Sequence, residues 1–410
     1  MDTNYDIIYL SLFRWDGPYS SISEAMAKVL AKNNRVFYIN HPYSYKDYFT
    51  EIPGDQYRER RARLRGGDNQ YEEVHPKVIS VIPPLTLPIN FLPVGPLHRS
   101  LNQRNQGIIL RAIKEVITRY NIKRFIYLNC FNPFFAPVLP KEYGAVMSIY
   151  QCIDDMAVSE YTIRHGVRLE EEAIRAADAL TVTSRELYRL KSPLNPVAHI
   201  VHNAAETAIF QRAQTEALPC PPELTHLEGK VIGFVGNMDA LRIDYPLLKK
   251  IAETHTDKTL VLVGPVNSPE IKNLGIDRLR NVVFTGPKPI EELAPYLQRF
   301  DCAIIPFLCN TLTKSIYPLK INEYLAAGRP VVSTSFSEDI QSFGEHIYLS
   351  DSHEAFLNNI QRAIAEDSIE RREERLEVAQ NNNWDARVEQ IWEIINDFIQ
   401  QKTTNVGQPV

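Results

Sequence analysis

Short apolar runs of strand length alternate along this chain with amphipathic segments of helical period, and the alternation continues through two successive rounds. This alternation is typical of βαβ units, in which helices cover a parallel β-sheet. A proline-rich polar stretch at 219–222 lies where the first round gives way to the second. A chain of 410 residues is long enough for two or three domains. We therefore expect two α/β lobes, with parallel sheets that face a central cleft.

The expected strands follow the apolar runs. In the first round they are Asp6–Leu10, Val36–Ile39, Val78–Val81, Arg124–Leu128, Ala145–Tyr150, Ala179–Thr183 and Ala198–Val201. In the second round they are Lys230–Val235, Thr259–Val263, Val282–Phe284, Cys302–Ile305, Pro330–Thr334 and His346–Leu349. Helical spacing of apolar residues predicts helices at Ser23–Lys32, Gln106–Tyr120, Pro246–Glu253, Glu291–Arg299, Lys320–Ala327 and Glu354–Glu366.

The alternation of strand and helix patterns gives the expected domain boundaries. They are an N-terminal domain at 1–205, a C-terminal domain at 206–382, and a final helix at 383–402. That helix carries an apolar stripe formed by Val388, Ile391, Trp392, Ile395, Phe398 and Ile399. A stripe of this length needs a surface to cover it. We expect the helix to cross back and pack on the N-terminal domain.

Composition and charge exclude several classes of protein. The chain is 44% hydrophobic and 23% charged, which is typical of a folded protein and excludes long disorder. A net charge of −5 gives no general affinity for nucleic acid. No window approaches eighteen apolar residues, and the polar start at 1–6 does not resemble a secretory signal. We therefore expect a cytoplasmic protein.

Cysteine and histidine give no sign of a metal site. The five cysteines are scattered, without a CxxC pair, at Cys130, Cys152, Cys220, Cys302 and Cys309. The ten histidines form no HExxH pair. An odd number of unclustered cysteines indicates free thiols in a reducing compartment.

The second round places polar residues where its first strand ends. Gly236 and Asn237 follow that strand, and a loop with Arg242 leads into the next helix. Glycine lets the backbone approach a ligand, and a helix N-terminus attracts phosphate. There is no GxGxxG or GxxxxGK[ST] pattern, so neither the usual dinucleotide fold nor a P-loop is indicated. These three residues are candidate ligand-binding residues, although a tight turn would explain the glycine equally well.

The segment at 317–323, Tyr-Pro-Leu-Lys-Ile-Asn-Glu, opens another expected helix. Pro318 suits a helix start, and Lys320 and Glu323 share a face of the first turn. The Lys320 ammonium would attract a diphosphate, and the Glu323 carboxylate could accept bonds from a pair of sugar hydroxyls. We include Tyr317 in the same candidate site. The alternative is an ordinary salt bridge on a surface helix.

Residues 323–332, Glu-Tyr-Leu-Ala-Ala-Gly-Arg-Pro-Val-Val, resemble the nucleotide-sugar signature of GT-B glycosyltransferases. Residues 301–307 are similar to the strand that leads into that signature. Residues 201–206 with Phe210 are similar to the family's crossover into the second lobe, and 176–184 to its "A-D-x-V-x-x-x-S" strand. The resemblance covers nearly the whole chain in the expected order. It implies a group 1, GT4-like enzyme with two Rossmann-like lobes, whose C-terminal lobe holds the donor.

The chain departs from the family pattern at two places. Many retaining members of the group carry two glutamates separated by seven residues, and the first of these falls on Ser315. Ala204 and Ala205 stand where the crossover usually has glycine and valine. The missing glutamate leaves the stereochemical outcome in question.

In the first lobe, Asp154 and Asp155 directly follow an expected strand. This resembles the "D-D" loop of some bacterial exopolysaccharide glycosyltransferases. In the inverting glucuronosyltransferases of xanthan type, an aspartate of this loop is the general base. Either carboxylate could take the proton of an acceptor hydroxyl, which favours inversion. The alternative is a helix N-cap with a solvated neighbour.

The resemblance implies a hexosyltransferase that moves a sugar from a nucleoside diphosphate sugar to a cell-surface polysaccharide or lipid-linked acceptor. Arg242 and Lys320 would neutralise the departing diphosphate, so no metal or other cofactor is expected, and no nucleic-acid partner. A non-catalytic nucleotide-sugar-binding protein and a bilobal nucleotide-sugar epimerase share the fold and remain alternatives.

A basic run and an apolar loop in the first lobe suggest contact with a membrane. Residues 57–65 hold five arginines, and the following loop carries Leu85, Leu87, Ile89, Phe91 and Leu92. Such a surface could rest on the anionic inner face of the cytoplasmic membrane. A solvated helix face would explain the arginines as well.

Overall fold

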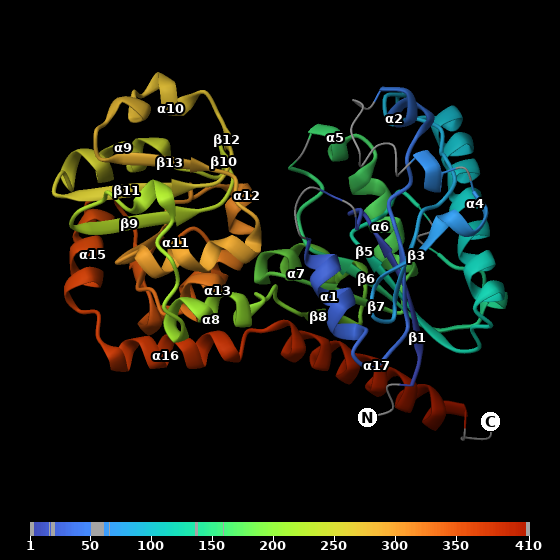
Figure 1. Ribbon diagram of the computed structural model, residues 1–410. Helices are drawn as coiled ribbons and strands as arrows, with labels where there is room; N and C mark the ends of the chain where they lie inside the picture. Colours follow the sequence, from blue (N-terminus) through green and yellow to red (C-terminus); the bar gives the residue numbers. More distant parts are fainter. Residues whose placement is uncertain are drawn as a thin grey trace. The chain divides into compact units, whose positions relative to one another are not determined.

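The computed structural model describes residues 4–15, 17, 21–50, 61–64, 66–135, 138–158 and 160–406. The chain forms two compact units: Met1–Val201 together with Val388–Val410, and His202–Arg387. The first division falls four residues before the expected boundary at 205 (205 − 201 = 4). The first unit therefore takes its residues from two separate stretches of the chain (Figure 1).

The first unit is built on an eight-stranded sheet in the order β3-β4-β2-β1-β5-β6-β7-β8. Its strands are β1 (Asp6–Ser11), β2 (Val36–Ile39), β3 (Tyr71–His75), β4 (Val78–Val81), β5 (Phe125–Cys130), β6 (Ala145–Cys152), β7 (Ala179–Val182) and β8 (Ala198–Ile200). All neighbours pair in parallel except β3 with β4. The strand order reverses between β1 and β5, and ligands bind at such a switch point, beyond the carboxyl ends of the strands.

Two helices of the first unit begin with a serine N-cap. The Ser21 hydroxyl accepts a bond from Glu24 N ahead of α1, and Ser184 does the same for Leu187 N ahead of α7. The helices are α1 (Ile22–Leu30), α2 (Tyr45–Thr50), α4 (Pro96–Arg119), α5 (Glu160–Ile163), α6 (Gly166–Ala176), α7 (Arg185–Lys191) and α17 (Trp384–Val406). Trp392 of α17 stacks on Tyr5 with ring centroids 6.3 Å apart, so this helix packs on the first unit beyond Val388.

The helix expected at Gln106–Tyr120 begins ten residues earlier, at Pro96 (106 − 96 = 10). Its first turns bury polar residues instead of apolar ones, among them His98 and Asn105. Asn105 exchanges two hydrogen bonds of 2.9 Å with the backbone of Leu87 and so fixes the preceding loop. An apolar period could not reveal a helix end that is held by polar contacts.

The second unit has a six-stranded, all-parallel sheet in the order β13-β11-β9-β14-β15-β16, beside a small β10-β12 pair. Its strands are β9 (Lys230–Val235), β10 (Met238–Asp239), β11 (Lys258–Val263), β12 (Val266–Asn267), β13 (Val282–Gly286), β14 (Cys302–Ile305), β15 (Val331–Thr334) and β16 (Tyr348–Ser350). Its helices are α8 (Thr207–Thr215), α9 (Tyr245–Thr254), α10 (Glu270–Asn273), α11 (Leu293–Arg299), α12 (Thr311–Lys314), α13 (Leu319–Ala326), α14 (Glu338–Gln341), α15 (His353–Ala365) and α16 (Ile369–Gln380). The switch point lies between β9 and β14.

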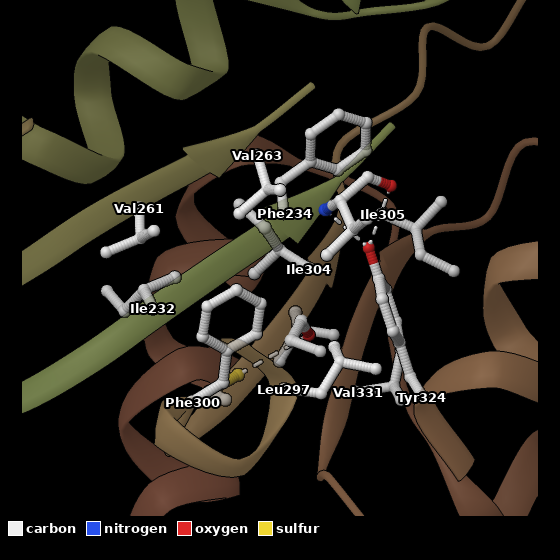
Figure 2. Close-up of a cluster of buried hydrophobic side chains, with 14 of the residues drawn as sticks. Ile232, Phe234, Val261, Val263, Leu297, Phe300, Ile304, Ile305, Tyr324 and Val331 are labelled. Atoms are coloured by element: carbon white, nitrogen blue, oxygen red, sulfur yellow. Dashed lines mark hydrogen bonds between the residues drawn. The ribbon is translucent and has the colours of Figure 1, made fainter. Parts of the chain in front are cut away.

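The core of the second unit is packed tightly under β9. A Cβ built on Gly233 would lie 2.1 Å from the ring of Phe300, so the aromatic ring occupies the place of a side chain on the strand. Figure 2 shows Phe300 and Tyr324 rising from the helical layer toward Ile232 and its neighbours. This tight packing fixes the position of β9 and therefore of the residues that follow the strand. None of the helices in the described ranges combines the length and apolar character needed to cross a bilayer.

Candidate functional site

Two glycines allow the carboxyl end of β9 to approach its neighbours closely. Gly236 has φ 155°, and a Cβ at this position would lie 2.5 Å from Cε of Lys320. Gly264, which follows β11, has φ 136°, and a Cβ there would lie 2.0 Å from the Gly236 carbonyl oxygen. The glycines therefore let the Lys320 side chain lie across the end of the strand.

Helix α13 is held against β9 by a residue that the sequence analysis did not assign to the site. The Tyr324 hydroxyl accepts a bond from Val235 N at 2.8 Å and donates to Val235 O at 3.3 Å (Figure 2). One turn earlier, Lys320 Nζ lies 3.4 Å from Oε2 of Glu323. Both side chains are only partly exposed. These two hydrogen bonds, the Tyr324 clamp, thus fix the Lys320 ammonium and the Glu323 carboxylate at the end of β9.

The loop after β9 adds a second cation. Asp239 Oδ1 accepts bonds from the backbone of Leu241 and Arg242, and the Arg242 guanidinium lies 3.5 Å from Asp239 Oδ2. In the described part of the chain, the buried Nε of Arg242 has no hydrogen-bond acceptor. The Arg242 carbonyl accepts a bond from Leu308 N, which follows β14. Lys320 and Arg242 thus lie at the carboxyl ends of β9 and β14, the two strands of the switch point.

Two more of the predicted residues have defined surroundings. Asn237 Oδ1 accepts a 2.8 Å bond from Nδ2 of Asn267, beside the β10-β12 pair. Tyr317 is only 3% exposed, and its ring stacks on His202 at 4.6 Å. Burial raises the pKa of the Tyr317 phenol. The structure therefore gives Tyr317 a packing role beneath α13, whereas Asn237 lies beside Gly236 in the loop.

The position of the missing glutamate is occupied by a buried hydroxyl. Ser315 is buried, and its hydroxyl donates a 2.8 Å bond to the carbonyl of Leu312. This bond uses the only hydrogen that the side chain can donate. Ser315 therefore supplies neither a carboxylate nor an exposed donor to a sugar.

In the first unit, Asp154 and Asp155 follow β6 at the carboxyl edge of the sheet. Asp155 Oδ1 accepts a 3.0 Å bond from Ala157 N and lies 3.8 Å from Nζ of Lys191. Asp154 is half-buried, and its carbonyl accepts a bond from Sγ of Cys152 at 3.4 Å. The Asp155 carboxylate is thus bound to its own loop and lies near the end of α7.

The neighbouring strand ends carry polar groups that the motif search missed. The pKa of His41, which follows β2, is lowered to about 3. Burial of the ring disfavours the charged imidazolium, and the nearby Arg14 disfavours it further. Asn132 Nδ2 donates to Ser11 O at 2.9 Å and lies 3.4 Å from His41 Nδ1. Phe131 has φ 56°, a strained backbone that often marks a functional site. The loop after β1 and Asn132, two residues beyond β5, were the available signals.

The structure corrects part of the expected membrane surface. Ile89 is buried, and Arg63 bonds to Glu72 at 2.7 Å and to the Ser80 carbonyl at 3.2 Å, so neither is available to a bilayer. Arg61 lies over the ring of Tyr48 at 4.3 Å.

Of the five arginines at 57–65, Arg58, Arg60 and Arg65 lie outside the described residues. In the described ranges, no group of three or more His, Cys, Asp or Glu side chains is placed to hold a metal ion.

Comparison with known proteins gives one family match and one curated relative. Residues 229–366 match the family described as "Glycosyl transferases group 1". The chain is 27% identical over 273 residues to a putative teichuronic acid biosynthesis glycosyltransferase, TuaH, from Bacillus subtilis (strain 168). That match spans 62% of this chain and 68% of the relative.

Solved structures share the fold over nearly the whole chain. Sucrose-phosphate synthase from Thermosynechococcus elongatus superposes with a TM-score of 0.67 at 17% identity, covering 97% of this chain and 100% of the other. Anabaena HepE in complex with UDP gives 0.63 at 14% identity, covering 96% and 100%. A trehalose-phosphate synthase from Burkholderia vietnamiensis gives 0.70 at 11% identity, covering 96% and 99%. These chains have the GT-B fold.

Proposed function

We propose that this chain, which resembles group 1 glycosyltransferases in sequence and shares their GT-B fold, transfers a sugar from a nucleotide-sugar donor to a cell-surface polysaccharide or a lipid-linked precursor of one. The observation that carries the donor assignment is the Lys320 side chain lying across Gly236 at the end of β9. The relative named for teichuronic acid biosynthesis supports a polysaccharide acceptor. The xanthan-type resemblance of the Asp154–Asp155 loop points to the same class of acceptor.

The second unit supplies the charges that a departing nucleoside diphosphate requires. We assign Lys320 and Arg242 to the diphosphate, and Gly236 and Asn237 to its backbone contacts. We assign Glu323, which lies 3.4 Å from Lys320, to the ribose hydroxyls. Preorganised cations stabilise charge that develops on a leaving group, and this role does not require a metal ion.

We further propose that the reaction inverts the anomeric centre, with a carboxylate of the Asp154–Asp155 loop as general base. The buried Ser315 supports this assignment, because the retaining pattern places a glutamate there. Asp155 accepts a bond from Ala157 N and faces Lys191, so we assign Asp155 to holding the loop and Asp154 to the proton transfer.

Incubation with uridine, guanosine and adenosine diphosphate sugars tests the reaction class. With one donor and a lipid-linked acceptor, we expect release of the nucleoside diphosphate and a product heavier than the acceptor by one sugar residue, both read by mass spectrometry. An unchanged donor mass with an altered sugar would instead indicate an epimerase. Binding without nucleotide release under any acceptor would indicate a binding protein and contradict the proposal.

We also propose that the first unit rests on the anionic inner face of the cytoplasmic membrane, through a surface that shares Phe91 with the expected one. Phe91, Val94 and Leu97 are exposed on the loop before α4 and on its first turn. Arg164 is exposed and donates a 2.9 Å bond to the Phe91 carbonyl. Exposed apolar side chains beside an arginine match a bilayer surface, where apolar groups enter the headgroup boundary and cations attract anionic lipid.

Liposome sedimentation tests this surface. We expect binding to anionic vesicles that weakens as salt rises, because salt screens the arginines. Phe91→Ala with Leu97→Ala should weaken it at least about tenfold, since each side chain loses roughly 1.5–3 kcal/mol of burial. Ile369→Ala is the matched control, because Ile369 in the second unit is 70% exposed and Phe91 is 71% exposed. Equal binding to neutral vesicles, or an equal loss of binding in the Ile369→Ala control, would contradict the proposal that this surface contacts the membrane.

A further inference from the structure

A buried ion pair lies next to the loop that carries Asp154 and Asp155. Lys191, the last residue of α7, places Nζ 2.7 Å from Oε2 of Glu170 on α6. Glu170 is 0% exposed and Lys191 is 7% exposed. Buried charges are costly even when they are paired, and a well-packed apolar pair can often replace them without loss of stability. The fold alone therefore does not require this pair.

The ion pair also contacts the loop. Nζ of Lys191 lies 3.8 Å from Oδ1 of Asp155. Sγ of Cys152 lies 3.4 Å from Oε1 of Glu170 and 3.4 Å from the carbonyl oxygen of Asp154. Both residues of the loop are thus connected to Glu170 and Lys191, one through its side chain and the other through its backbone.

One ammonium serves two carboxylates in this cluster. Burial raises the pKa of Glu170, and the Lys191 ammonium limits that rise. Burial lowers the pKa of Lys191, but Glu170, Cys152 and Asp155 together raise it by more, so the amine stays protonated. The Tyr150 hydroxyl donates to Glu170 Oε1 at 3.4 Å. Glu170 is therefore satisfied within the protein, and Lys191 retains an attraction for Asp155.

We infer that Lys191 is a positioning residue for the transfer reaction: it holds the Asp155 carboxylate and thereby fixes the loop so that Asp154 faces the acceptor hydroxyl. The two residues are adjacent in a bend, and the Asp154 carbonyl accepts a bond from Cys152, so holding Asp155 restricts the orientation of Asp154. This inference rests on the proposed role of Asp154 as base.

The test separates positioning from folding by replacing the pair as a whole. Lys191→Met alone leaves Glu170 unpaired, so we expect a lower melting temperature. Adding Glu170→Gln removes the stranded charge while keeping an amide for Tyr150 and Cys152, so the melting temperature should return toward the wild-type value. We nevertheless expect this double variant to have a kcat about 10- to 100-fold lower with an unchanged donor KM, because the loop is misplaced. Recovery of both stability and kcat would overturn the inference.

A mutant cycle shows whether Lys191 acts through Asp155. In an Asp155→Asn background, the Lys191→Met/Glu170→Gln change should cause no further loss of kcat, whereas independent effects would multiply and contradict the inference. Lys191→Arg keeps the charge and should retain most of the activity; it also provides the test if the double variant fails to fold. Lys230→Met, which breaks a 2.9 Å pair with Asp301 at the amino end of β9, is the control and should leave kcat unchanged.

The same measurements distinguish this inference from the proposed base. If Asp154→Asn retains wild-type turnover, the base assignment fails whatever the Lys191 variants do. If Asp154→Asn is inactive while the Lys191→Met/Glu170→Gln variant has wild-type kcat, the base stands and the positioning role of Lys191 fails.

Discussion

Replacing Asp154 by asparagine is expected to lower kcat by about 10²–10⁴-fold, the contribution of a general base to a transfer reaction. Asparagine keeps the size of the side chain but cannot take the proton of the acceptor hydroxyl. The loop remains held, because Asp155 keeps its bond from Ala157 N and its contact with Lys191. Donor KM should be unchanged, and turnover is measured with both substrates saturating.

Asp155→Asn is the matched comparison, since it makes the same chemical change one residue along the chain. It should cost less, because Asp155 positions the loop and does not take the proton. The anomeric configuration of the product, read by proton NMR with a donor of known configuration, checks the mechanism directly. Retention of configuration would contradict a general-base mechanism even if both variants were inactive.

Lys320→Ala is expected to reduce sugar transfer by at least about 10³-fold while the protein remains folded. The ammonium lies at the end of β9, where a departing diphosphate develops charge, and alanine leaves that charge uncompensated. Among the described residues, Lys320 forms an ion pair with Glu323 alone, at a long distance of 3.4 Å, and its own side chain is partly exposed. The melting temperature should therefore stay close to that of the wild type, and released nucleoside diphosphate measures the turnover.

Lys249→Ala is the control for that variant. Lys249 also pairs with a glutamate on its own helix, Glu253 at 3.6 Å, but it lies on α9 and has no contact with Gly236. It should leave transfer unchanged, because an exposed pair contributes little. Wild-type turnover by Lys320→Ala, or an equal loss in Lys249→Ala, would contradict the donor site.

The parallel core could be predicted from sequence because its strands are buried on both faces and form continuous apolar runs. β2, β4, β9 and β14 lie where those runs predict them. β3 (Tyr71–His75) was missed, since this edge strand is partly exposed and mostly polar. An edge strand of this kind is stabilised by contacts with segments that are distant in the sequence, and a local sequence pattern does not indicate those contacts.

The site divides in the same way. Gly236 and Lys320 could be predicted because each belongs to a short local pattern, a strand end or a helix start. Their closeness follows from the pairing of β9 and β14 and from the Tyr324 clamp, which no spacing reveals. Lys191 and Glu170, 21 residues apart (191 − 170 = 21), meet only because α6 and α7 pack together. Tyr317 is buried against His202, and its assignment to the site stays a prediction.

The discontinuous first unit has a consequence for biosynthesis. Tyr5 cannot stack on Trp392 until Trp392 has been synthesised. The whole of the second unit, 186 residues (387 − 202 + 1 = 186), is translated between these two residues. At roughly 5–20 residues per second, that interval is about 10–40 s on the ribosome. The uninterrupted second unit can close its own sheet in that time, while the first exposes the surface reserved for α17. The second unit is therefore complete before the first, whose surface for α17 stays uncovered until residues 388–406 have been made.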